Sequence, residues 1–247
     1  MDRAARLVES TYRRLPATLR HFALGSLLGG LERVVGKQRV WALINGSARS
    51  QRSVEDPFVL TRLGRPADDN RRLLEVGCVN SPFSYMLPEA GFELTGIDLR
   101  PWRAVHPRFQ FVQGDFVLKA DLPGAPFDVI YSISVLEHVA MGGYGNDASL
   151  TESAERDFAR RARHLLRGGG RLILTVPCGK EGVGCVGLPE AYRVYPPGWI
   201  ERVICDAGFQ LREAAYWRIT NNAYWDLVGP HEVVAEAFGL GCFEFVT

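Results

Sequence analysis

The fold is decided by the stretch Leu73-Leu74-Glu75-Val76-Gly77-Cys78-Val79-Asn80-Ser81-Pro82. It begins with a short, mostly apolar run that ends at a glycine, which is the pattern of a buried strand followed by a turn. Ser81 then supplies an N-cap, and Pro82 supplies a first helical residue whose φ is already set. We therefore predict a strand, a turn and a helix whose first backbone N–H groups face a ligand.

A second apolar segment, residues 92–97, predicts the next strand, and an acidic residue closes it. Asp98 lies about 20 residues beyond the glycine of the turn. In a strand–turn–helix–strand unit, an acidic side chain at this distance accepts hydrogen bonds from ribose hydroxyls. The two strands together predict a binding site for a cofactor that contains a nucleoside.

Size and charge narrow the class of protein. The chain has 247 residues, of which 47% are hydrophobic, so it is large enough to bury a full core. Its net charge is +1, from 29 basic and 28 acidic residues, so no global field favours nucleic acid as a partner. We predict no metal, because no cluster of histidines and carboxylates has the spacing of metal ligands.

The cysteines and the N-terminus predict a soluble, cytoplasmic protein. The five cysteines form no C-x-x-C pair, and their odd number fits reduced thiols in an intracellular protein. The N-terminus is charged from Asp2 onward, and its apolar stretches are interrupted by Arg, Gly and Pro. Neither a signal peptide nor a membrane span fits this pattern.

Residues 1–66 have apolar positions at helical spacing, with twelve Lys or Arg between them. We interpret this segment as an N-terminal helical cap region, made of amphipathic helices that pack on the main domain and expose their arginines. The alternative is that a basic helix of this segment lies on a membrane surface. We favour packing on the domain, because basic amphipathic helices are common in globular proteins.

Residues 67–247 have a different pattern, in which short strands alternate with helices. This pattern predicts an α/β fold with a doubly wound, seven-stranded, mostly parallel sheet. The predicted helices span residues 150–166, ended by the glycines at 168–170, and about residues 197–207. The predicted strands are residues 72–76, 92–97, 109–113, 127–132, 171–175, 210–218 and 242–246.

The third and fourth strands also end in residues suited to an adenosyl ligand. Asp115 follows the third strand and can accept a hydrogen bond from an adenine amino group, while Phe116 offers an apolar flank to the ring. The fourth strand leads into Ser134, Glu137 and His138. Because parallel strands present their carboxyl ends at one edge, we expect these side chains beside the first turn.

From about Arg71 to the C-terminus, the chain resembles the class I S-adenosylmethionine-dependent methyltransferases. Glu75-Val76-Gly77 resembles the first motif of that family, and Gly114-Asp115 resembles its adenine motif. Residues 135–139, 165–172 and 207–209 resemble the segments around its fourth, fifth and sixth strands. The resemblance implies a Rossmann-like methyltransferase fold whose last strand is antiparallel, and S-adenosyl-L-methionine as cofactor. The implied cofactor-binding residues lie at the strand ends: Glu75, Gly77, Cys78, Asn80, Ser81, Asp98, Leu99, Asp115, Phe116, Ser132, Ser134 and Glu137.

The chain also departs from that family. Val79 and Ser81 stand where further glycines are usual, which restricts how closely the backbone approaches a ligand. The missing glycines keep open the alternative of a methyltransferase-like binding or scaffold protein. An NAD(P)-dependent oxidoreductase is a second alternative, because that class shares the first strand, the turn and the ribose acid. The oxidoreductase fits less well, because pyrophosphate binding favours G-x-G-x-x-G and this turn has a single glycine.

The predicted reaction is methylation of a small-molecule hydroxyl. Residues 137–147, with 176–180, resemble bacterial methyltransferases of sugar, polysaccharide or secondary-metabolite pathways, which implies a sugar or glycosylated metabolite as acceptor. His138 is the candidate base, since a histidine has an unperturbed pKa near neutrality. A purely structural role for His138 is the alternative. Residues 141–147 are predicted to form a loop over the acceptor, and residues 221–226 to recognise it.

Overall fold

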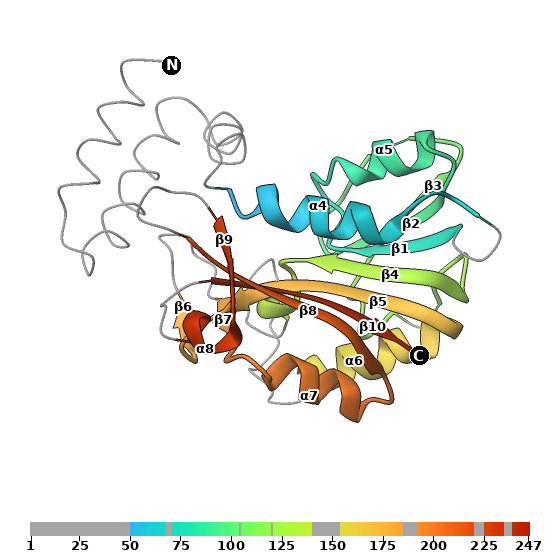
Figure 1. Cartoon of the computed structure of the whole chain (residues 1–247). Helices are drawn as coiled ribbons and strands as arrows, with labels where there is room; N and C mark the ends of the chain where they lie inside the picture. Colours follow the sequence, from blue (N-terminus) through green and yellow to red (C-terminus); the bar gives the residue numbers. More distant parts are fainter. Residues whose placement is uncertain are drawn as a thin grey trace, which may run out of the picture.

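The computed structural model describes residues 50–67, 71–103, 105–119, 121–139, 154–184, 192–219, 225–234 and 239–247 (Figure 1). In this part of the chain, one sheet of eight strands has the order β3-β2-β1-β4-β5-β10-β8-β9. The parallel strands are β1 (Arg72–Val76), β2 (Glu93–Asp98), β3 (Phe109–Gln113), β4 (Phe127–Ile133) and β5 (Leu166–Cys178). The remaining strands of this sheet are β8 (Gln210–Ile219), β9 (Trp225–Val228) and β10 (Gly239–Val246).

Helices cover both faces of the sheet (Figure 1). One layer contains α4 (Arg52–Leu63) and α5 (Phe83–Glu89), and the other contains α6 (Ala154–Leu165) and α7 (Trp199–Asp206). Shorter elements are the 3-10 turn η1 (Leu136–His138), the helix α8 (Pro230–Val233) and the paired strands β6 (Gly182–Gly184) and β7 (Tyr192–Val194). None of the helices in the described segments has the length and apolar character needed to cross a membrane.

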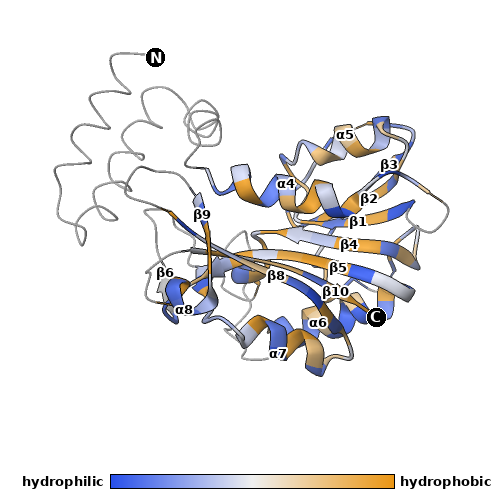
Figure 2. Ribbon diagram, viewed as in Figure 1, coloured by the Kyte–Doolittle hydropathy of each residue, from blue (hydrophilic) through white to orange (hydrophobic). Residues whose placement is uncertain are grey.

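The strand β1 is mostly apolar because both of its faces are buried. Leu73 packs in the cluster beneath α4 and α5, and its neighbour Leu74 packs in the cluster beneath α6 and α7. Successive side chains of a strand point to opposite faces, so a central parallel strand needs apolar residues at both. Figure 2 shows hydrophobic colouring along the middle strands of the sheet. The predicted doubly wound α/β class is thereby confirmed.

The last strand of the sheet, β10, is antiparallel, as the family resemblance implied, and the sheet has one strand more than predicted. β10 lies between β5 and β8 and is antiparallel to both. The sheet has eight strands instead of the predicted seven, because β9 pairs with β8 at the edge. Trp225 and Asp226, which we predicted in an acceptor loop, begin β9 opposite Ile219 and Arg218. The rest of that predicted loop, residues 221–224, lies outside the described residues.

The boundary between α6 and β5 also differs from the prediction. We expected the glycines at 168–170 to end the helix, but α6 ends at Leu165 and the glycines lie within β5. The register of β4 against β5 shifts from Phe127↔Leu166 to Val129↔Arg171, so an irregularity in the pairing accommodates the glycines. Residues 150–153 of the predicted helix lie outside the described residues.

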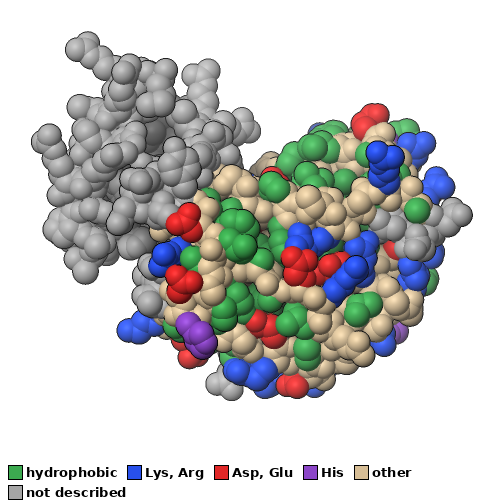
Figure 3. Space-filling view, viewed as in Figure 1, with side chains coloured by type: hydrophobic (Ala, Val, Ile, Leu, Met, Phe, Trp, Pro, Cys, Tyr) green, Lys and Arg blue, Asp and Glu red, His purple; other side chains and the backbone are tan. Residues whose placement is uncertain are grey.

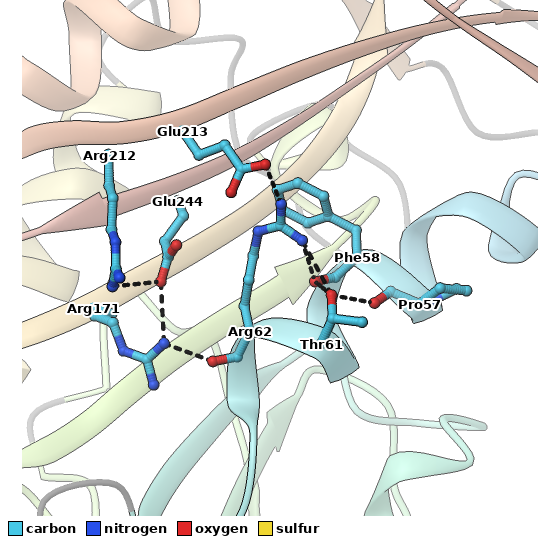
Figure 4. A network of polar contacts seen from close by, with 8 residues as sticks. All are labelled: Pro57, Phe58, Thr61, Arg62, Arg171, Arg212, Glu213 and Glu244. Carbon is cyan, nitrogen blue, oxygen red and sulfur yellow. Dashed lines mark hydrogen bonds and ion pairs between the residues drawn. The ribbon is translucent and has the colours of Figure 1, made fainter.

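An ion-pair cluster fixes the C-terminal end of α4 to the sheet (Figure 4). Arg62 pairs with Glu213 of β8, and the Arg62 carbonyl accepts a 2.6 Å hydrogen bond from Arg171 of β5. Arg171 and Arg212 approach the buried Glu244 of β10 at 3.0 and 3.4 Å. Figure 3 shows basic and acidic side chains next to one another on this face, where they line an open cavity of about 390 Å³. The cluster lies toward the amino ends of the parallel strands, away from the carboxyl ends where the cofactor site is predicted.

Candidate active site

The turn after β1 requires its glycine. Gly77 has φ +81°, and its N–H donates a 2.8 Å hydrogen bond to the carbonyl of Ile97 in β2. A Cβ at this position would lie 2.3 Å from Cγ2 of Val135, so a side chain does not fit. Asn80 also has a positive φ, of +70°. The helix α5 begins at Phe83, one residue later than predicted, so its N-cap is Pro82 and not Ser81. The Ser81 hydroxyl accepts a 3.2 Å hydrogen bond from the N–H of Phe83.

The structure brings Asp98 to this turn. Asp98 ends β2 and is 8% exposed, and its Oδ2 accepts a 3.0 Å hydrogen bond from the N–H of Val79. Arg100 binds the same carboxylate through its backbone N–H and its guanidinium. The acid at the end of β2 and the turn after β1 therefore form one unit, which is the arrangement that a ribose site requires.

Four buried polar atoms lie where β1 and β4 end and η1 begins, and none has a hydrogen-bond partner of good geometry among the described residues. They are Oε2 of Glu75, Oη of Tyr131, Oγ of Ser132 and Oε2 of Glu137. β1 pairs with β4 so that Glu75 lies opposite Tyr131 and Val76 lies opposite Ser132, which places these groups at the same edge. Buried polar groups are almost always satisfied, so these atoms are candidates for contacts with a ligand.

Burial raises the pKa values of the carboxyl groups of Glu75 and Glu137. It raises the pKa of Glu75 from 4.5 to about 8, an effect that the nearby hydroxyls of Ser81 and Tyr131 partly offset. Burial likewise raises the pKa of Glu137 to about 8, and the charge of Glu55 adds to this effect. A buried carboxyl of this kind becomes ionised readily when a cation is placed beside it. The edge is thus suited to a positively charged ligand.

The N-terminal end of α4 contributes residues that the sequence analysis did not assign to the site. Glu55 is fully buried, and its Oε1 accepts hydrogen bonds from Ser134 and, at 2.7 Å, from Thr175. Ser134 has φ +50° and also accepts a 3.3 Å hydrogen bond from Gln51. Arg52 donates to the carbonyl of Ile133 at 3.2 Å. The spacing of Arg52 and Glu55 on one helix face was the available signal, but it did not indicate which strand the pair contacts.

On the adenine side, Asp115 and Phe116 have structural contacts. Oδ1 of Asp115 accepts hydrogen bonds from the N–H groups of Val117 at 2.7 Å and Leu118 at 3.2 Å. Phe116 is 6% exposed, and its ring packs on Phe158 of α6 with 4.7 Å between the centroids. The carbonyl of Leu99 accepts a 3.1 Å hydrogen bond from Gln113. Contacts of these residues with an adenine ring stay predictions.

Cys78 is buried against the neighbouring strand. Its side chain is completely inaccessible, and a Cβ added to Gly96 would lie 2.6 Å from its Sγ. Burial raises the pKa of the Cys78 thiol well above its usual range, and the charges of Glu75 and Asp98 add to this. A protonated, inaccessible thiol is a poor nucleophile, so the contribution of Cys78 is packing beneath the turn.

His138 and Glu137 follow β4 directly in η1. Nε2 of His138 lies 4.0 Å from Oε1 of Glu137, and the His138 side chain is 22% exposed whereas that of Glu137 is 3% exposed. Tyr192 of β7 approaches the imidazole edge-on, with 6.4 Å between the ring centroids. Arg193 of the same strand donates a 2.8 Å hydrogen bond to the carbonyl of Val139. The predicted loop at residues 141–147 lies outside the described residues.

These features match the predicted class of enzyme. A family model described as a methyltransferase domain matches residues 51–223. The chain belongs to this methyltransferase family. The prediction of a class I S-adenosylmethionine-dependent methyltransferase is confirmed, and the oxidoreductase alternative is set aside. No curated protein sequence matches this methyltransferase. Among its described residues, no group of three or more His, Cys, Asp or Glu side chains is arranged to hold a metal ion.

Solved structures share the fold of this methyltransferase. The 1,6-didemethyltoxoflavin-N1-methyltransferase of Burkholderia thailandensis is 17% identical, with a TM-score of 0.56 over 94% of this chain and 91% of that chain. An S-adenosylmethionine-dependent methyltransferase of Mesorhizobium loti is 14% identical, with a TM-score of 0.53 over 83% and 100%. The [4+2]-cyclase SpnF is 17% identical, with a TM-score of 0.53 over 80% and 82%. A cyclase among these structures illustrates that the fold alone does not specify the reaction.

Proposed function

We propose that this methyltransferase transfers a methyl group to a hydroxyl of a small molecule, with a sugar unit or a secondary metabolite as the acceptor. The observation that carries the proposal is the position of His138 beside the buried Glu137, immediately after β4. A hydroxyl must lose its proton during transfer, and His138 is the partly exposed group at this edge that can accept one. The proposed role of His138 is therefore that of general base.

The cofactor site in this proposal spans the ends of β1, β2 and β4. Asp98 receives the ribose hydroxyls, and Asp115 uses its second carboxylate oxygen for the adenine amino group. Glu75, Ser132 and Glu137 hold the methionine part, because their unsatisfied buried oxygens need a cation or a donor. Gly77 allows the backbone of the turn to approach. When bound, S-adenosylmethionine supplies an electrophilic methyl group on a sulfonium, so the protein needs to hold the acceptor in line and remove its proton.

The acceptor lies, in this proposal, between η1 and β7. Tyr192 of β7 packs edge-on against His138 of η1, and the hydrogen bond of Arg193 to Val139 fixes β7 against η1. The similar structure from Burkholderia thailandensis has bound 1,6-didemethyltoxoflavin, which supports a small molecule as acceptor. The division into a helical cap of residues 1–66 and a methyltransferase domain of residues 67–247 also stays a proposal. Helix α4, which belongs to the proposed cap region, packs on β4 beside the candidate site.

The cofactor assignment is tested by binding of S-adenosylhomocysteine to Asp98→Ala and Asp98→Asn. We expect loss of binding in both, measured by calorimetry, because neither side chain provides a charged acceptor for the ribose hydroxyls. Asp121→Ala, which removes an exposed acid, is the control and should bind normally. Unchanged affinity in the Asp98 variants would refute the assignment.

The reaction is tested by transfer of an isotope-labelled methyl group into a panel of glycosides, phenols and amines. We expect label in hydroxyl-bearing acceptors, with the methyl carbon at the chemical shift of an ether in the NMR spectrum. Label found only on nitrogen or carbon would overturn the choice of hydroxyl while leaving the methyltransferase class intact.

A further inference from the structure

The carboxylate of Asp98 is already saturated with hydrogen bonds. Oδ1 accepts from the backbone N–H of Arg100 at 2.9 Å and from its Nε at 3.2 Å. Oδ2 accepts from the N–H of Val79 at 3.0 Å and from Nη2 of Arg100 at 3.2 Å. A carboxylate offers about four lone-pair sites, so these four donors leave none for a ribose.

A ribose diol can therefore enter only if donors leave, and the structure indicates which ones. The N–H groups of Val79 and Arg100 belong to the backbone and are fixed by the turn and by the end of β2. The guanidinium of Arg100 is held by a flexible side chain that is 39% exposed, whereas the Asp98 side chain is 7% exposed. The two guanidinium donors of Arg100 are thus the ones that can leave the carboxylate for solvent, whereas the two backbone donors cannot.

Arg100 also closes the site from the other side. Its Nη2 donates to the carbonyl of Val79 at 3.3 Å, so one guanidinium bridges the turn after β1 and the acid after β2. Val79 stands where a glycine is usual in the family, and this bridge ties its backbone down. The Arg100 side chain therefore both orders the turn after β1 and occupies the carboxylate of Asp98.

We propose that Arg100 competes with the ribose for Asp98: its guanidinium binds the carboxylate and must swing away when an adenine nucleoside with a free 2′,3′-diol binds. The inference rests on Asp98 as the ribose acceptor. It assigns to Arg100 the control of cofactor affinity, and of product release by the reverse movement. Arg100 acts through Asp98 and is a positioning residue.

The experiment measures the dissociation constant of S-adenosylhomocysteine and the melting temperature of the free protein for wild type, Arg100→Ala, Arg100→Lys and Arg103→Ala. Arg103 is exposed and close in sequence, and it is not among the hydrogen-bond donors to Asp98, so its variant removes the same charge at a separate position. We expect Arg100→Ala to bind roughly three- to tenfold more tightly, because two charge-assisted donors no longer compete. The lysine variant, which lacks the two-pronged guanidinium, should lie between wild type and alanine.

The melting temperature separates competition from a structural role. We expect Arg100→Ala to melt at a lower temperature than wild type while binding more tightly, since the bridge to Val79 is lost. Binding that is unchanged or weaker in Arg100→Ala would overturn the proposal, because Arg100 would then support Asp98 instead of competing for it. Failure of the proposed function looks different: neither wild type nor Arg103→Ala would bind S-adenosylhomocysteine at all.

Discussion

The hydroxyl of Thr175 donates a 2.7 Å hydrogen bond to Oε1 of Glu55, joining the end of β5 to α4. Both side chains are fully buried. This contact, with the one from Ser134, attaches the N-terminal end of α4 directly over the ends of the central strands. The helix is therefore part of the wall of the site.

We predict that Thr175→Val destabilises the protein by roughly 1–3 kcal/mol, because the buried carboxylate of Glu55 loses a donor that valine cannot replace. The N–H of Ser134 also loses its contact with the Thr175 hydroxyl. Denaturant unfolding measures the change. Thr61→Val is the control, since Thr61 is exposed on the same helix, donates to backbone carbonyls of α4 and accepts from the adjacent, flexible Arg62 side chain. Equal, small effects of both substitutions would show that the contact to Glu55 is unimportant.

His138→Ala is predicted to bind S-adenosylhomocysteine as wild type does and to turn over roughly 100- to 1000-fold more slowly, the usual contribution of a general base. The acidic limb of the pH–rate profile should disappear with it. His164→Ala is the matched control, because His164 is exposed in the last turn of α6. An unaltered turnover rate in His138→Ala would remove this residue as the base.

The convergence of the candidate site residues at one edge of the sheet was predictable, because local sequence signals determine where the strands end. The apolar runs set β1, β2, β3 and β4, and parallel strands must end at one edge, so Gly77, Asp98 and Glu137 were expected to converge. Their convergence did not require knowledge of any long-range contact beyond the order of the strands.

What the sequence left open depends on contacts between distant segments. Nothing local indicates that Glu55 meets Thr175, or that Arg100 turns back onto Asp98 instead of pointing into solvent. The edge strand β9 was not predicted because it has only four residues, beginning at Trp225. Its strand conformation depends on pairing with β8, which no local pattern indicates. The glycines at 168–170 were predicted to end a helix, but they lie within β5, where the pairing with β4 is irregular.

We predict that the free protein loses stability as pH rises from about 5 to about 8. Burial raises the pKa of Glu75 from 4.5 to about 8, so between these values the folded state retains a proton that the unfolded state has lost. Stability is complete below the lower value and falls until the higher one is passed. Glu137, with its pKa also raised to about 8, acts in the same direction.

Glu75→Gln should flatten this dependence and make the protein more stable than wild type above about pH 8, by an amount on the order of a few kcal/mol. Melting temperatures across the pH range measure it. Glu181→Gln, at an exposed position, should leave the dependence unchanged. A wild-type stability that rises steadily from pH 5 to pH 8 would contradict the assigned direction.

The ion-pair cluster at the far end of α4 predicts unequal effects for its two glutamates. Glu244 is 4% exposed and lies 3.0 Å from Arg171, which is itself 19% exposed. Glu244→Ala leaves that half-buried guanidinium without its carboxylate, and we expect a loss of about 2–3 kcal/mol, below the full cost for a buried pair because Arg171 still donates to the Arg62 carbonyl. Glu213 is 48% exposed, so Glu213→Ala should cost less than about 1 kcal/mol although it also removes a partner of Arg62. Denaturant unfolding measures the loss of stability in the two variants. The affinity for S-adenosylhomocysteine should be unchanged in both, because the cluster lies away from the candidate cofactor site. Equal losses of stability would mean that burial does not decide the strength of this cluster.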